Sequence, residues 1–147
     1  MINEYKNFVN SSEHFENKRV QVGFEYKHQN ILSLKSFKLA NKEISSWDKY
    51  EPTPLYYLSD LAKYAGVSSI AYKDENLRFS LKSFKALGGA YAVANLLIKK
   101  LKEIGIEANS SDLIAGTYIE LTSKITVCCA TDGNHGRSVA WGAQKFG

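Results

Sequence analysis

The spacing of apolar residues predicts one long amphipathic helix in the middle of the chain. From residue 84 to residue 101, apolar side chains alternate spacings of three and four, which is the period of a helix face. Ser83 precedes this run and can accept hydrogen bonds from N–H groups of the first turn, whereas Gly105 favours a helix end. The residues predicted on its buried face are Phe84, Leu87, Tyr91, Ala94, Ile98 and Leu101.

Shorter elements are predicted before this helix. Ile44, Trp47 and Tyr50 recur at a spacing of three, which indicates a short helix over residues 41–50. Pro52 must end it, because proline biases its predecessor to extended backbone. The remaining predictions are a helix from a cap at Ser59 to Gly66 with Leu61, Ala62 and Ala65 on one face, a strand over 68–73 and a loop over 74–80.

After the long helix, strand and helix alternate again. Residues 106–124 predict an irregular connection with one short helix, and the apolar run Ile125–Ala130 predicts a strand. A helical pattern follows over residues 137–146. Alternating strands and helices are typical of an α/β layer with a parallel sheet, which is the fold class predicted here.

Two adjacent cysteines, Cys128 and Cys129, lie within the apolar run. A disulfide between neighbours would need a strained ring, and adjacent thiols do not have the spacing of a metal site. We therefore predict no metal site and expect reduced packing residues on a buried strand, as in a reducing compartment.

The composition narrows the class of protein. The chain has 147 residues, 44% hydrophobic and 23% charged, which is typical of a globular domain. No apolar run approaches the ~20 residues needed to span a bilayer, and the polar N-terminus lacks the apolar core of a signal peptide. The net charge of +4 comes from scattered lysines, so we expect no nucleic-acid partner, no membrane partner and a cytoplasmic location.

Gly88 and Gly89 interrupt the long helix one turn after its start. A glycine inside a helix costs about 1 kcal/mol relative to alanine. The pair therefore indicates that something large lies against the helix at this point. Close packing of the helix on a strand is the alternative.

The segment Thr131–Gly136 has the order strand, glycine-bracketed loop, helix. Such a loop directs backbone N–H groups at the space above a helix N-terminus and favours an anion there. Asp132 places a carboxylate in that space, which indicates proton chemistry more than simple anion binding.

Lys85 lies in the first turn of the long helix. A helix N-terminus disfavours a cation, and with partial burial it lowers the pKa of a lysine and frees its amine as a nucleophile. A neutral amine suits imine formation with an aldehyde. The alternative is an ordinary surface lysine.

Three motifs occur in one order along the chain: Lys73-Asp74-Glu75-Asn76, Ser83-Phe84-Lys85-Ala86-Leu87-Gly88-Gly89-Ala90 and Thr131-Asp132-Gly133-Asn134-His135-Gly136. Together they resemble the fold type II family of pyridoxal-phosphate enzymes, which includes serine and threonine dehydratases. Thr53-Pro54-Leu55 resembles the entry segment of that family. The resemblance implies a three-layer αβα fold with a parallel sheet, of which this chain holds a truncated N-terminal part.

The resemblance also implies roles for single residues. Lys85 matches the lysine that holds pyridoxal phosphate, and Asn134 matches the residue that hydrogen-bonds the cofactor's ring hydroxyl. Phe84 is placed beside the cofactor, with packing as the alternative. The loop residues Thr131, Asp132, Gly133, Asn134 and His135 match those that embrace the substrate carboxylate, and His135 has helix-start hydrogen bonding as its alternative.

Asp132 and the residues around it resemble the diaminopropionate ammonia-lyase branch of the family. Dehydratases usually carry a small neutral residue where this chain has Asp132. The resemblance implies that Asp132 removes the α-proton of the D-isomer. The expected reaction is elimination of 2,3-diaminopropionate to pyruvate and ammonia. A serine or threonine dehydratase and a non-catalytic remnant stabilised by self-association are the alternatives.

The domain organisation follows from the same resemblance. Residues 1–66 are expected to belong mainly to a large domain, and residues 67–147 to an incomplete small domain on the cofactor side. The chain ends within the helix after the loop. We therefore expect a fragment with weak cofactor binding and negligible turnover that self-associates, and a homodimer at full length.

Overall fold

The computed structural model describes residue 18 and residues 32–131 and 133–147. The chain divides into two compact units, Met1–Ser33 and Leu34–Gly147, and the elements below all belong to the second. In chain order they are α2 (Leu34–Ser45), β1 (Leu55–Tyr57), α3 (Ser59–Ala65), β2 (Ala71–Lys73), the 3₁₀ helix η1 (Glu75–Ser80), α4 (Lys85–Glu103), α5 (Ser110–Ile114), α6 (Ile119–Thr122) and α7 (Asn134–Phe146).

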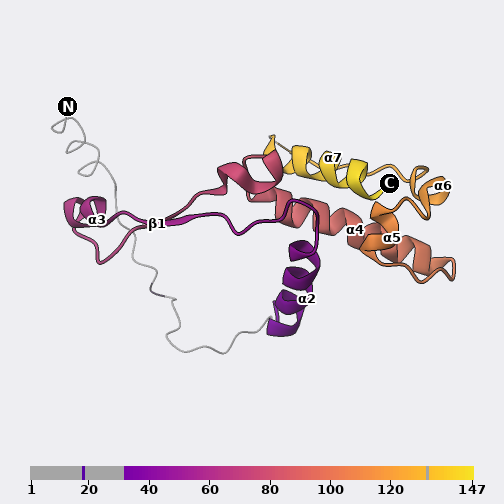
Figure 1. Cartoon of the computed structure of the whole chain (residues 1–147), viewed down its shortest axis with the longest axis horizontal. Coiled ribbons are helices and arrows are strands. Elements are labelled where there is room, and N and C mark those ends of the chain that lie inside the picture. The colour runs from indigo at the N-terminus through magenta and orange to yellow at the C-terminus, as the bar shows by residue number, and fades with distance from the viewer. Residues whose placement is uncertain (1–17, 19–31, 132) are drawn as a thin grey trace. The chain divides into compact units, whose positions relative to one another are not determined.

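The core is formed where α7 lies along α4 (Figure 1). The two helices approach closely because small residues face each other: a Cβ on Gly142 would lie 2.8 Å from the Cα of Ala90. Ser138 of α7 fills the space beside Gly89 and is fully buried. At Gly89 the neighbour of α4 is therefore another helix, α7, where the sequence predicted a large group or a strand.

An aromatic cluster closes one side of this helix pair. Trp47 packs with its ring centroid 5.3 Å from that of Phe146, and Phe79 lies 4.9 Å from Trp141. Trp47, Phe79 and Phe146 are all buried. Their burial attaches the segment after α2 and the segment before α4 to the same core.

The predicted face of the long helix is only partly correct. The helix begins at Lys85, so Phe84 stands at its N-cap and is 59% exposed instead of packed. Ala94 and Leu101 are buried as predicted, and Leu87, Tyr91 and Ile98 pack partly against the core. The observed buried face of α4 contains more small residues than predicted, because α7 packs closely against it. Its members are Ala86, Gly89, Ala90, Val93, Ala94, Leu97 and Leu101.

The C-terminal ends of α3 and α4 lie at the glycines predicted to end them. Gly66 ends α3 and Gly105 follows α4, both with the left-handed φ values of 68° and 81° that glycine adopts without strain. The starts agree less well. Leu58 precedes α3 at its N-cap position instead of Ser59, and α7 starts at Asn134, earlier than the predicted residue 137.

The other early predictions need correction. The helix predicted over residues 41–50 runs from Leu34 to Ser45, and Trp47 and Tyr50 reach the core from the turn that follows it. Of the face predicted for α3, Ala62 alone is buried. The loop predicted over 74–80 contains η1, and the connection over 106–124 contains two short helices, α5 and α6.

Within the described residues there is one sheet, and it is antiparallel. Leu55 pairs with Lys73, and Tyr57 pairs with Ala71, so β1 and β2 form a two-stranded ribbon, and α3 lies in the connection between the two strands (Figure 1). The predicted strand over 68–73 is present only at its end. The parallel sheet remains a prediction for a longer chain.

Ile125–Ala130 is not a strand in the structure. Its residues nevertheless alternate between half-buried and exposed, as a strand does, with Val127 and Cys129 on the half-buried side. A strand exists only when a neighbour shares its hydrogen bonds, and no described segment pairs with this one. Cys128 is therefore exposed, and the prediction that it is buried is wrong.

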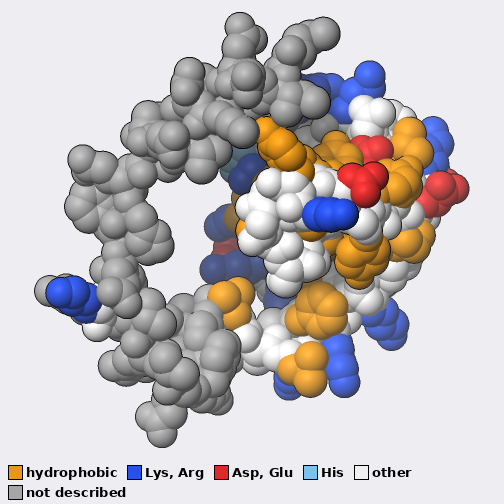
Figure 2. Space-filling view, turned by 90° about the vertical axis from the view of Figure 1, so that its left-hand side faces the viewer, with side chains coloured by type: hydrophobic (Ala, Val, Ile, Leu, Met, Phe, Trp, Pro, Cys, Tyr) orange, Lys and Arg blue, Asp and Glu red, His pale blue; other side chains and the backbone are white. Residues whose placement is uncertain are grey.

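Many apolar side chains stay exposed on the described surface. They are prominent on the face that Figure 2 presents, with Lys and Arg side chains beside them. No helix in the described part of the chain is long and apolar enough to cross a membrane. The exposed apolar side chains of the β1–α3–β2 segment are Leu55, Tyr56, Tyr57, Leu61, Tyr64, Val67 and Tyr72.

Candidate active site

Lys85 is the first residue of α4, as the sequence predicted to within one turn. The Ser83 hydroxyl accepts a hydrogen bond from the backbone N–H of Lys85 at 3.2 Å, but the N-cap position is that of Phe84, so Ser83 lies one residue before the place predicted for it. The Lys85 Nζ lies 4.9 Å from the centroid of the Phe84 ring. The side chain of Lys85 is exposed, so the partial burial expected for it is absent from the structure.

Thr131 organises the loop before α7. Its Oγ1 accepts hydrogen bonds from the N–H of Gly133 at 3.0 Å and from the N–H of Gly136 at 2.8 Å. A Cβ on Gly136 would lie 2.5 Å from the Thr131 methyl, so this position requires glycine. The Thr131 side chain therefore fixes the backbone that leads into α7 by hydrogen bonds to two N–H groups. Asp132 lies outside the described residues.

The starts of α4 and α7 are joined by one hydrogen bond. The buried hydroxyl of Ser138 donates to the carbonyl oxygen of Lys85 at 2.5 Å. This bond brings the lysine and the loop motif to the same end of the helix pair, although they are separated by about fifty residues of sequence.

Two adjoining cavities lie at this end. The smaller, about 270 Å³, is lined by Phe84, Lys85, Gly88, Gly89 and His135. The larger, about 580 Å³, has Asn134 at one wall and the segment from β2 into η1 at another. Its lining is Tyr72, Lys73, Asp74, Glu75, Asn76, Lys82, Ser83, Phe84 and Asn134.

The predicted site residues are distributed over these cavities. Lys85 shares the smaller one with His135, and Asn134 lines the larger one. Phe84 lines both and therefore stands between them. Thr131 and Gly133 shape the loop, and neither lines a cavity described above.

The chemistry of the two cavities is compatible with an aldehyde cofactor. The primary amine of Lys85 in the smaller cavity can form an imine with an aldehyde, and the Asn134 amide in the larger cavity can donate to a ring hydroxyl. A Cβ on Gly88 would meet nothing within 4 Å, so the surface next to Lys85 is open. Lys85 and Asn134 would therefore hold the aldehyde and the ring hydroxyl of pyridoxal phosphate.

A buried ionic cluster lies directly before the lysine, and the sequence had not indicated it. Arg78 is 5% exposed, and its Nε lies 2.8 Å from Glu75 Oε2. Its other nitrogens donate to the Glu51 carbonyl at 2.8 Å and to Thr53 Oγ1 at 3.0 Å. In the sequence, the i,i+3 spacing of Glu75 and Arg78 is a pattern from which this ion pair could have been predicted.

The electrostatics of the cluster follow from its contacts. The hydrogen bond from Arg78 lowers the pKa of Glu75 below its ordinary value of 4.5. The same pair raises the pKa of Arg78, so both groups are held in their charged forms. Thr53 also donates to Glu75 at 2.6 Å, which ties the segment before β1 to the pair.

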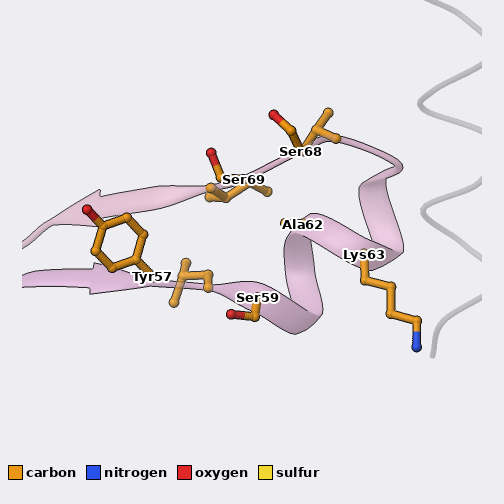
Figure 3. Close-up of a pocket in the computed structure, with 9 residues that line it drawn as sticks. Tyr57, Ser59, Ala62, Lys63, Ser68 and Ser69 are labelled. Carbon is orange, nitrogen blue, oxygen red and sulfur yellow. The ribbon is translucent and has the colours of Figure 1, made fainter.

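A third cavity, about 260 Å³, lies between α3 and the ribbon (Figure 3). The hydroxyls of Ser68 and Ser69 and the amine of Lys63 point away from the space between helix and strands. Because no polar groups converge there, we do not assign it a function.

Comparison with known proteins decides the family. The family model described as "Pyridoxal-phosphate dependent enzyme" matches residues 47–147. The chain belongs to this family of enzymes. The family's match includes Lys85, the loop Thr131–Gly136 and the cluster around Arg78.

The chain is also similar to diaminopropionate ammonia-lyases. It is 45% identical to that of Escherichia coli K12 over 80% of this chain and 28% of the relative. It is 46% identical to that of Salmonella typhimurium over 67% of this chain and 24% of the relative. The chain thus spans about a quarter of the length of these relatives.

Solved structures agree with this similarity. The crystal structure of the Escherichia coli enzyme with an aminoacrylate-PLP azomethine intermediate matches 78% of this chain at 43% identity, with a TM-score of 0.60. The apo form of the same enzyme matches with a TM-score of 0.57. These similarities support a partial fold type II architecture for this chain.

Proposed function

We propose that these residues form the lysine-bearing part of an enzyme that eliminates ammonia from 2,3-diaminopropionate with pyridoxal phosphate. Membership of the cofactor's family and 45% identity to diaminopropionate ammonia-lyases support this proposal. The observation that carries it is the cavity shared by Lys85 and His135, which the packing of α4 on α7 creates. When bound, the cofactor supplies an electron sink for the substrate's α-carbon.

Each predicted residue keeps its role within the proposal. Lys85 binds the cofactor aldehyde and Asn134 its ring hydroxyl, while Phe84 lies against the cofactor. The loop residues Thr131 to His135 embrace the substrate carboxylate, through N–H groups other than those of Gly133 and Gly136, which donate to Thr131 Oγ1. Asp132 accepts the α-proton of the D-isomer, because a carboxylate is ordinarily ionised at neutral pH and can act as a general base.

The 147 residues alone are proposed to turn over negligible substrate. The proposed full-length enzyme is a cytoplasmic homodimer. The exposed apolar side chains of the β1–α3–β2 segment favour self-association of the shorter chain. A serine or threonine dehydratase is less favoured, since Asp132 replaces a small neutral residue. Comparing turnover of diaminopropionate with turnover of serine by the full-length protein separates the two activities.

The chain contains its own control for the lysine assignment. The sequence Leu-Lys-Ser-Phe-Lys occurs at residues 34–38, ending at Lys38, and at residues 81–85, ending at Lys85. Both lysines are exposed, but Lys85 alone of the two lines the candidate cavity. Incubation with pyridoxal phosphate, borohydride reduction and peptide mapping should label Lys85 well above Lys38. Equal labelling of the two lysines would overturn the proposal.

A further inference from the structure

The repeated pentapeptide adopts two different conformations. At residues 34–38 it is helical and forms the start of α2. At residues 81–85 it forms a turn, in which Lys82 has a φ of 57° and the helix begins only at Lys85. The local sequence is identical, so the turn before Lys85 is imposed by residues outside the pentapeptide.

That turn is part of a strained segment. Phe79, Ser80 and Lys82 all have left-handed φ values, of 46°, 60° and 57°. This conformation is unfavourable for residues that carry a Cβ, and it persists only where the surroundings enforce it. Three such residues within four positions, directly before Lys85, require strong anchors.

Arg78 is the polar anchor. Its planar guanidinium binds the Glu75 carboxylate through two nitrogens and also reaches Glu51 and Thr53, so four hydrogen bonds to three residues fix its position. It lies 5.3 Å from the centroid of the Tyr50 ring. Because Arg78 is buried, these bonds are not exchanged with water.

Phe79 is the apolar anchor on the next residue. Its ring packs against Trp47 at 6.0 Å and Trp141 at 4.9 Å. Arg78 thus holds this backbone by polar contacts and Phe79 holds it by apolar ones, and both side chains lie beside Tyr50. Only a few residues separate Phe79 from Lys85. The orientation of the first turn of α4 therefore depends on the contacts of Arg78 and Phe79.

We propose that Arg78 is a positioning residue, which holds the strained turn and thereby directs the Lys85 amine into the cavity beside His135. The inference rests on the proposed function of Lys85. Arginine is required because lysine, with one point charge, cannot bind Glu75, Glu51 and Thr53 in a fixed fork.

The test compares two variants of Arg78's network with a matched control. Arg78→Lys keeps the charge and loses the fork, and Thr53→Val removes one hydroxyl from the network without changing the side-chain shape. Thr122→Val is the control, since Thr122 is also a buried threonine, and its hydroxyl donates to the Tyr118 carbonyl at 3.2 Å, outside the network of Arg78. The readout is the ratio of Lys85 to Lys38 labelling by pyridoxal phosphate and borohydride.

We expect Arg78→Lys to lower this ratio by about tenfold, because small displacements of a reacting group cost rate steeply. Thr53→Val should lower it less, and Thr122→Val should leave it unchanged at a similar loss of thermal stability. If Arg78→Lys does not fold, the comparison of Thr53→Val with Thr122→Val decides.

An unchanged ratio in folded Arg78→Lys, or equal ratios in both threonine variants, would overturn the inference and leave the lysine assignment intact. A wild-type protein that labels Lys85 and Lys38 equally would overturn the proposed function, and the inference with it. The two failures are thus distinguishable.

Discussion

The hydroxyl of Ser138 donates a 2.5 Å hydrogen bond to the carbonyl oxygen of Lys85 and joins the starts of two helices. Ser138 also lies against Gly89, where a Cβ would approach its Oγ to 2.4 Å. One buried serine thus contacts α4 at two points, by packing against Gly89 and by its hydrogen bond to Lys85.

Replacing Ser138 with alanine should destabilise the protein by about 1–2 kcal/mol, because the hydrogen bond is lost at a fully buried site. Urea unfolding followed by circular dichroism measures this difference. Ser45→Ala is the matched control, since the Ser45 hydroxyl donates to the Lys42 carbonyl at 3.2 Å on an exposed surface. A loss no greater than that of the control would contradict the role given to Ser138.

The two adjacent glycines of α4 should respond oppositely to the same substitution. Gly89→Ala should cost roughly 1–3 kcal/mol, since its methyl group overlaps Ser138 in a packed interface. Gly88→Ala should raise the stability by about 0.5–1 kcal/mol, because nothing lies within 4 Å of the new Cβ and alanine favours the helix. Thermal melting of both variants checks the pair, and two changes of the same sign would refute the packing described here.

Acid should weaken the cluster around Arg78. The folded-state pKa of Glu75 is below its ordinary value of 4.5, so its contribution is complete above pH 4.5. That contribution is lost as the pH falls through the lowered folded-state value. Glu75→Gln should therefore show a shallower loss of stability than wild type below pH 4.5 in urea titrations at several pH values.

Glu103→Gln provides the control for this pH dependence. The pKa of Glu103 is also lowered, by its hydrogen bond to Lys100, but the pair is exposed at the far end of α4. Water and salt screen such a pair, so its removal should change the acid limb much less. Equal effects of the two substitutions would show that burial of Glu75 is not what matters.

Asp132 should determine which isomer of the substrate reacts. In the full-length protein, Asp132→Asn should reduce elimination from D-diaminopropionate more than from L-diaminopropionate, because the amide cannot accept the α-proton. Steady-state kinetics with each isomer measures the two losses. Equal losses for both isomers would assign Asp132 a structural role instead.

The sequence determined the features that depend on local chemistry. The long helix, the ends at Gly66 and Gly105, and the Thr131 hydrogen bonds before α7 follow from spacing, from glycine's freedom at positive φ and from side chains that bond nearby backbone. The order of its motifs was also enough to indicate the enzyme family that the comparisons support.

Features that depend on a distant partner were not predictable in this way. The buried face of α4 turned toward Gly89 because α7 lies there, and the strand expected at Ile125–Ala130 lacks a paired neighbour. The ionic cluster joins Glu51, Thr53 and Arg78 across more than twenty residues of sequence. No periodicity in the sequence encodes such contacts.

The repeated pentapeptide shows most clearly which features come from local sequence and which come from tertiary contacts. Leu-Lys-Ser-Phe-Lys carries the same local preferences at residues 34–38 and at residues 81–85, and its sequence alone permits a helix in both places. Tertiary structure makes the second copy a turn, because buried Arg78 and Phe79 hold its start and Ser138 bonds to its last residue. The sequence supplied the lysine, and packing decided where its amine lies.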